Sequence, residues 1–134
     1  MNADLPLAFA NALARLADGV EPAHLIGVGG AVGALARHWV FQRLSWDSFP
    51  VATLAVNVLG SFLLGVVAFA NPGPATAQFV GTGICGAFTT FSTFSVETVQ
   101  LLERGDRRPA AIAAGSNLLA SLGSIWLAWW LVSL

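Results

Sequence analysis

Charged side chains are scarce in this 134-residue chain, at 10% of the residues, whereas soluble domains carry about 25%. From Ser48 to Val96 the sequence has none, and from Pro109 to Leu134 it has none again. A membrane-spanning helix needs about 20 consecutive apolar residues. The first uncharged run is long enough for two such helices and the second for one. These absences exclude an ordinary soluble domain and predict an integral membrane protein.

Several other residue types are absent or rare. The chain has no lysine and no tyrosine, and a single cysteine, Cys85, excludes an internal disulfide. The arginines form no basic patch of the kind that binds nucleic acid, so no nucleic-acid partner is expected. Residues 1–22 lack the basic start and apolar core of a signal peptide. Leu5, Phe9 and Leu16 share one helical face, so this leader is expected to be either amphipathic at the membrane surface or disordered.

Apolar length and helix-ending signals predict an all-α membrane protein with four transmembrane helices. Asn71-Pro72-Gly73-Pro74 separates the second span from the third, and the charge cluster at 103–108 separates the third from the fourth. Residues 23–134 would therefore form one transmembrane domain. The expected helices cover about 23–44, 50–70, 76–102 and 109–134.

The third span contains an unusual run of hydroxyls and aromatic rings, Gly-Ala-Phe-Thr-Thr-Phe-Ser-Thr-Phe-Ser-Val-Glu, from Gly86 to Glu97. Glycines precede this run, and its threonines and serines favour local hydrogen bonds over a continuous helix. The pattern predicts that the third helix is broken near its middle, around Gly86 to Thr90. Broken membrane helices free backbone groups, and those groups can bind ions.

Each predicted span carries a stripe of small or polar residues on one face. A hydroxyl or amide at membrane depth is costly unless it faces a partner, a cavity or a conduction path. One such stripe is weak evidence, because serine and threonine often bond to the preceding helical turn. Four stripes in four helices are more informative. Their main members are Gly29, Gly33 and Arg37, then Asn57 and Ser61, then Thr90, Thr93 and Glu97, then Asn117, Ser121 and Ser124.

The chemistry of these stripes favours a small anion as the transported solute. They contain amides, hydroxyls and phenyl rings, and their one carboxylate, Glu97, lies near the end of its span. A cation or proton path would place Asp or Glu near the membrane midplane. Amide and hydroxyl donors and the positive edge of a phenyl ring can instead solvate an anion, and they bind weakly enough to release it.

Three segments, GAVGALAR (30–37), TLAVNVLGSFLLG (53–65) and GAFTTFSTFSVE (86–97), resemble the CrcB/Fluc fluoride channels. The resemblance covers roughly residues 23–134. It implies a fluoride-selective channel in the cell membrane of a prokaryote, which exports cytoplasmic fluoride passively and so lowers its toxicity. It also implies an antiparallel dimer of two four-helix subunits, with two fluoride pathways and one structural Na⁺ at the centre.

The resemblance further implies which residues carry the function. The phenyl rings of Phe91 and Phe94 would line the fluoride pathway, and the Asn57 amide would donate to the ion. The other implied site residues are Ser92, Thr93 and Ser121 in a polar track, Arg37 in a vestibule, and Gly86 and Thr89, whose backbone carbonyls would bind the Na⁺.

Two features depart from the family pattern. Ala87 stands where a second glycine is common, so the break would depend more on Gly86. Arginines are concentrated on the side of the first and third loops, which the positive-inside rule places in the cytoplasm. An antiparallel homodimer needs nearly equal numbers of arginines on the two sides, so this asymmetry favours an oppositely oriented relative as the partner. A second copy of the chain is the simpler assembly, and both partners remain open.

Three other classes of protein remain as alternatives. A small four-helix drug/proton antiporter would need a carboxylate in its first helix, where this chain has none, and it would favour tyrosine. A non-transporting assembly subunit would not need polar stripes in every span. An intramembrane enzyme is disfavoured because His24 and His38 both lie near the ends of the first span, without a paired nucleophile or metal-ligand spacing.

Overall fold

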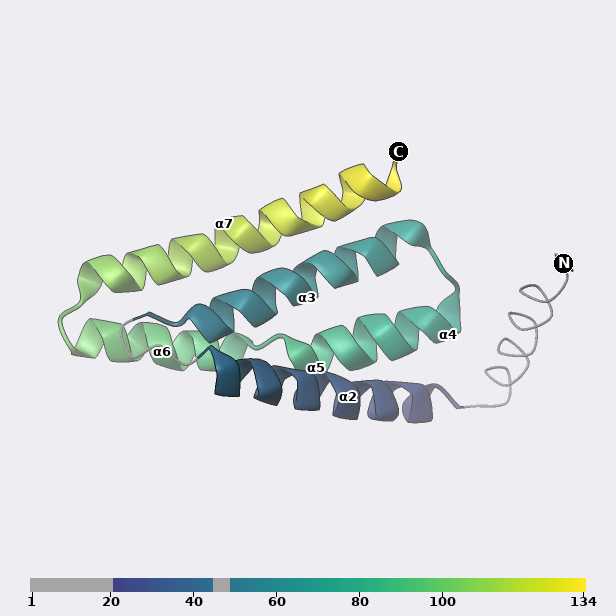
Figure 1. Cartoon of the computed structure of the whole chain (residues 1–134), viewed down its shortest axis with the longest axis horizontal. Helices are drawn as coiled ribbons and strands as arrows, with labels where there is room; N and C mark the ends of the chain where they lie inside the picture. The colour runs from purple at the N-terminus through teal and green to yellow at the C-terminus, as the bar shows by residue number, and fades with distance from the viewer. Residues whose placement is uncertain (1–20, 45–48) are drawn as a thin grey trace, which may run out of the picture.

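The computed structural model describes residues 21–44 and 49–134, and this part of the chain is all-helical (Figure 1). The predicted four-helix fold is confirmed, with an interrupted third helix. The prediction for the leader lies outside the described residues, except for Glu21 and Pro22. The elements are α2 (Pro22–Arg43), α3 (Val51–Ala70), α4 (Pro74–Thr76), the π-helix η1 (Ala77–Cys85), α5 (Gly86–Phe88), α6 (Phe91–Glu103) and α7 (Arg107–Val132).

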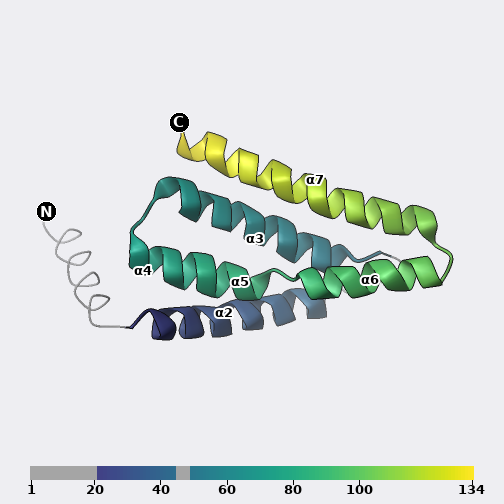
Figure 2. The same ribbon diagram turned by 180° about the vertical axis from the view of Figure 1, so that it is seen from behind.

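The helices form an elongated bundle in which α2 and the third span run in one direction while α3 and α7 run in the other (Figures 1 and 2). α3 packs along α7, and α2 packs along η1 and α5. The gap between α5 and α6 lies near the middle of the bundle, and α3 passes beside it (Figure 1). The interruption therefore lies within the bundle and not at one of its ends.

Within residues 21–44 and 49–134, three helical stretches are long and apolar enough to cross a membrane: Val51–Ala70, Pro74–Glu103 and Arg107–Val132. α2 has 22 residues, and at 1.5 Å per residue it reaches about 33 Å, which is sufficient length. It also carries two histidines and two arginines, so it is less apolar than the other three. The protein is a multi-pass membrane protein, and the crossing by α2 stays a prediction.

The break in the third helix occurs at Thr89 and Thr90, inside the interval predicted from the sequence. Thr89 has φ −80° and ψ 159°, and Thr90 has φ −149° and ψ 118°, so both are extended. Gly86 itself is helical, with φ −61° and ψ −36°. The chain therefore breaks at the two β-branched residues, which favour extended backbone, and Gly86 lies in the helical turn before them.

Glycines bring α2 close to the half of the third span that precedes the break. A Cβ atom on Gly29 would overlap the carbonyl oxygen of Phe79, and one on Gly33 would overlap that of Ile84. Small residues at a helix crossing let two backbones approach in this way. Arg37 follows Gly33 by one turn, so this close packing places its side chain beside the break.

Candidate functional site

Asn57 on α3 holds the broken segment in place. The backbone N–H of Thr90 donates to Asn57 Oδ1 at 2.8 Å, and Asn57 Nδ2 donates to the Thr90 carbonyl at 3.1 Å. Thr90 is buried, and a buried backbone amide outside a helix needs such a partner. One amide side chain thus replaces two backbone hydrogen bonds that the break would otherwise leave unmade.

A close approach of Thr89 to α3 accompanies this clamp. Gly60 lies one turn after Asn57, and a Cβ atom there would overlap the Thr89 side chain. The Thr89 hydroxyl donates to the Cys85 carbonyl at 3.0 Å, which caps the end of the preceding helical segment. The glycine beside Asn57 therefore has a packing role at the break.

Thr90 also starts the helix α6. Its Oγ1 accepts a hydrogen bond from the Thr93 backbone N–H at 3.2 Å, which is the usual N-cap interaction. The same hydroxyl donates to Thr93 Oγ1 at 3.0 Å and lies 3.3 Å from Ser92 Oγ. These hydroxyls form one small network at the helix N-terminus.

One cavity, of about 340 Å³, lies between α3, the break, α6 and α7. Its lining includes five of the site residues predicted from the sequence: Asn57, Phe91, Phe94 and Ser121 of the predicted pathway, and Thr89 of the predicted cation site. The two phenyl rings are 5.7 Å apart between centroids and are tilted by 44°. We call this space the phenyl cavity.

Ser61 and Asn117 also line the phenyl cavity, although neither was predicted as a site residue. The sequence did carry a signal for both. Ser61 shares a face with Asn57, and Asn117 shares a face with Ser121. Asn117 is moreover tied directly to the clamp, since its Oδ1 accepts a hydrogen bond from Asn57 Nδ2 at 3.1 Å.

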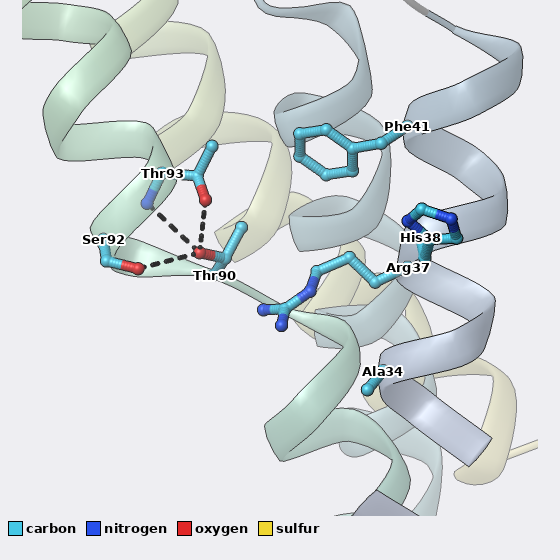
Figure 3. Close-up of a pocket in the computed structure, with 7 residues that line it drawn as sticks. All are labelled: Ala34, Arg37, His38, Phe41, Thr90, Ser92 and Thr93. Carbon is cyan, nitrogen blue, oxygen red and sulfur yellow. Dashed lines mark hydrogen bonds between the residues drawn. The ribbon is translucent and has the colours of Figure 1, made fainter. Parts of the chain in front are cut away.

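A second cavity, of about 370 Å³, lies between α2 and the start of α6 (Figure 3). Three predicted site residues line it, namely Arg37, Ser92 and Thr93, together with His38, Phe41 and Thr90. The Arg37 guanidinium points toward the break, and its Nη1 donates to the Thr89 carbonyl at 3.3 Å (Figure 3). We call this space the arginine cavity.

The structure therefore separates the predicted polar track into two parts. Ser121 lies with the phenyl rings, whereas Ser92 and Thr93 lie with Arg37. Thr90 lines both cavities and lies at the boundary between them. Among the described residues, no carboxylate lines either cavity.

Two buried side-chain oxygens, Thr53 Oγ1 and Glu97 Oε2, have no hydrogen-bond partner in the described part of the chain. Neither residue lines the two cavities. Among residues 21–44 and 49–134, the structure contains no group of three or more His, Cys, Asp or Glu side chains that could hold a metal ion.

Comparison with known proteins identifies clear relatives. Residues 24–129 match the family described as "CrcB-like protein, Camphor Resistance (CrcB)". The chain is 50% identical over 113 residues to the fluoride-specific ion channel FluC 2 of Haloarcula marismortui. This alignment covers 84% of this chain and 95% of that protein. It is 44% identical to FluC 1 of Halobacterium salinarum, covering 84% and 94%, and 43% identical to FluC of Idiomarina loihiensis, covering 81% and 89%.

Proposed function

The chain belongs to the CrcB/FluC family of fluoride-specific ion channels, and from this premise we propose that fluoride crosses the membrane through the phenyl cavity. The observation that carries the proposal is the meeting of two phenyl rings, amides and hydroxyls in one space at a helix break. The protein is a channel and not an enzyme. Transport is passive, because fluoride that enters a cell as neutral HF dissociates inside and leaves down its own gradient.

The lining of the phenyl cavity suits a small anion. The hydrogen atoms at a phenyl edge carry partial positive charge, and amide and hydroxyl groups donate hydrogen bonds. These donors are neutral, so they hold an anion less tightly than a lysine or arginine would and allow it to leave. The residues we assign to this pathway are Phe91, Phe94, Asn57 and Ser121.

The arginine cavity provides an approach to that pathway. The guanidinium of Arg37 attracts anions and raises their local concentration. The hydroxyls of Ser92 and Thr93 lie in the same cavity and can solvate an anion there. We assign these three residues to a vestibule beside the break.

A second subunit completes the protein in this proposal. Phe91 is 79% exposed in the single chain, although it belongs to the proposed pathway. A large exposed phenyl ring next to a polar cavity is a surface that a partner would cover. We propose an antiparallel dimer of this chain, with two fluoride pathways.

The break also offers ligands for a structural Na⁺. In a continuous helix the Thr90 N–H would bond to the Gly86 carbonyl, but here it donates to Asn57. Gly86 is exposed in the single chain, and its carbonyl lacks that helical partner. The Thr89 carbonyl accepts from Arg37 and has a second lone pair. Carbonyl oxygens suit a hard cation, so Gly86 and Thr89 of two subunits would hold Na⁺, which would fix the two breaks relative to each other.

An antiporter is not supported by these observations. Such a protein needs a carboxylate in its first helix, and α2 has neither aspartate nor glutamate along its whole length. The third span ends at Glu103 and contains Glu97, and neither carboxylate lines either cavity. The relatives identified by sequence are likewise fluoride channels.

The proposal is tested by fluoride efflux from liposomes that contain the purified protein, measured with a fluoride electrode. Phe91→Ile and Phe94→Ile keep an apolar side chain but remove the aromatic edge. We expect each to reduce efflux by about tenfold or more, which corresponds to one lost charge-assisted contact. Variants that elute as the native protein does and still match its efflux would refute the assignment of the phenyl rings.

A further inference from the structure

The hydrogen bonds of Asn57 leave it no free N–H donor. The Thr90 backbone N–H can only donate, so the Asn57 atom that faces it must be Oδ1. This fixes the orientation of the amide and turns Nδ2 toward the Thr90 carbonyl and toward Asn117, at 3.1 Å each. A side-chain amide has two N–H groups, and both are therefore used within the protein.

The same reasoning orients Asn117. Because Asn57 Nδ2 donates, the atom of Asn117 that it meets must be the acceptor Oδ1. The Nδ2 group of Asn117 makes no hydrogen bond to any residue of 21–44 or 49–134. The side chain is half-buried on α7 and lines the phenyl cavity. Its two N–H donors are thus left for whatever occupies that cavity.

We propose that Asn117 is the amide that donates to fluoride in the phenyl cavity, and that Asn57 orients it. This inference rests on the proposed function and changes the role of one residue in it. Asn57 becomes a positioning residue, which holds the break on one side and Asn117 on the other. Ser121 lies one helical turn from Asn117 on the same face of α7, so it offers the next donor along the path.

The orientation of Asn117 also favours an anion over a cation. A free amide presents both a carbonyl oxygen, which binds cations, and an NH₂ group, which binds anions. Here the oxygen is engaged by Asn57. The cavity therefore meets only the donor end of the amide.

A matched pair of variants tests the role of Asn117 in the liposome assay. Asn117→Thr and Asn117→Val have nearly the same shape, and only the threonine has a hydroxyl that can accept from Asn57 and donate to the ion. We expect the threonine variant to stay within a few-fold of the native efflux and the valine variant to lose about tenfold or more. Ser116→Ala is the control, because the Ser116 hydroxyl bonds to the Ala113 carbonyl of its own helix at 3.2 Å and lines neither cavity.

Equal efflux from the threonine and valine variants would overturn the inference while leaving the proposed function in place. No fluoride efflux from the native protein would overturn the proposed function itself, and the inference with it. The two failures are therefore distinguishable.

A second measurement on the native protein does not depend on any variant folding. The side-chain NH₂ signals of Asn57 and Asn117 are followed by ¹⁵N NMR while fluoride is added, with chloride as the control anion. We expect the Asn117 signals to shift with fluoride and those of Asn57 to shift less. A shift confined to Asn57 would mean that Asn57 is the donor and would overturn the inference.

Discussion

Thr90 shows how a single residue can serve two structural elements and two cavities. Its backbone groups bond to Asn57, its hydroxyl caps α6, and its side chain lies between the phenyl cavity and the arginine cavity. The sequence marked Thr90 as part of a polar stripe. It did not reveal the bond to Asn57, because that partner lies 33 residues away and only the tertiary fold brings the two together.

Arg37 carries the clearest electrostatic expectation at this scale. If its charge concentrates fluoride near the break, Arg37→Leu should lower efflux several-fold, and Arg37→Lys should retain most of it. High salt should reduce the difference between the leucine and lysine variants, because it screens the charge. Fluoride efflux at two ionic strengths measures both effects.

Arg43→Leu is the matched control, since Arg43 lies on the same helix but is exposed and stacks on Trp39 at 4.9 Å. It should leave efflux nearly unchanged. A lysine variant of Arg37 as impaired as the leucine variant would contradict the charge argument. It would point instead to the hydrogen bond that Arg37 donates to Thr89.

At the scale of elements, the interrupted third helix was predictable and its exact break was not. The glycines up to Gly86 and the hydroxyls that follow it indicated an interruption. The break occurs at Thr89 and Thr90 because Asn57 replaces the backbone bonds lost there. The π-helix η1 before the break had no sequence signal of its own. The structure shows a packing role for one of its glycines, since Gly83 packs against Gly29.

The packing of α2 on η1 leads to a stability prediction. Gly33→Ala would place a Cβ atom into the Ile84 carbonyl, and the backbones would have to move apart. Overpacking of this kind costs about 1–3 kcal/mol, so the melting temperature of the protein in detergent should fall.

Gly27→Ala on the same helix is the control, because a Cβ there meets nothing within 4 Å. Alanine is also the better helix former, by about 1 kcal/mol, so this variant should melt at the native temperature or slightly above. An unchanged melting temperature for Gly33→Ala would show that the crossing of α2 and η1 is not tight.

At the scale of the whole molecule, the structure confirms the predicted four-helix fold and the relatives confirm the predicted family. The predicted dimer stays a prediction, because the structure contains one chain. The ends of α2 and α6 and the starts of α3 and α7 lie toward the same end of the bundle (Figure 1). Arg104, Arg107 and Arg108 therefore lie at the tip formed by α6 and α7, and Arg43, at the end of α2, lies in the same half of the bundle. An antiparallel dimer would place one such end on each side of the membrane. We propose the homodimer, since a single chain can then supply both pathways.

The most direct test of the central claim uses this chain expressed alone, purified and reconstituted into liposomes loaded with equal fluoride and chloride. Both ions are followed by selective electrodes after external anion is removed and a potassium ionophore balances the charge. The account predicts rapid fluoride efflux with chloride retained in the vesicles. Equal release of the two anions, or no fluoride release from protein that elutes as a folded dimer, would contradict it.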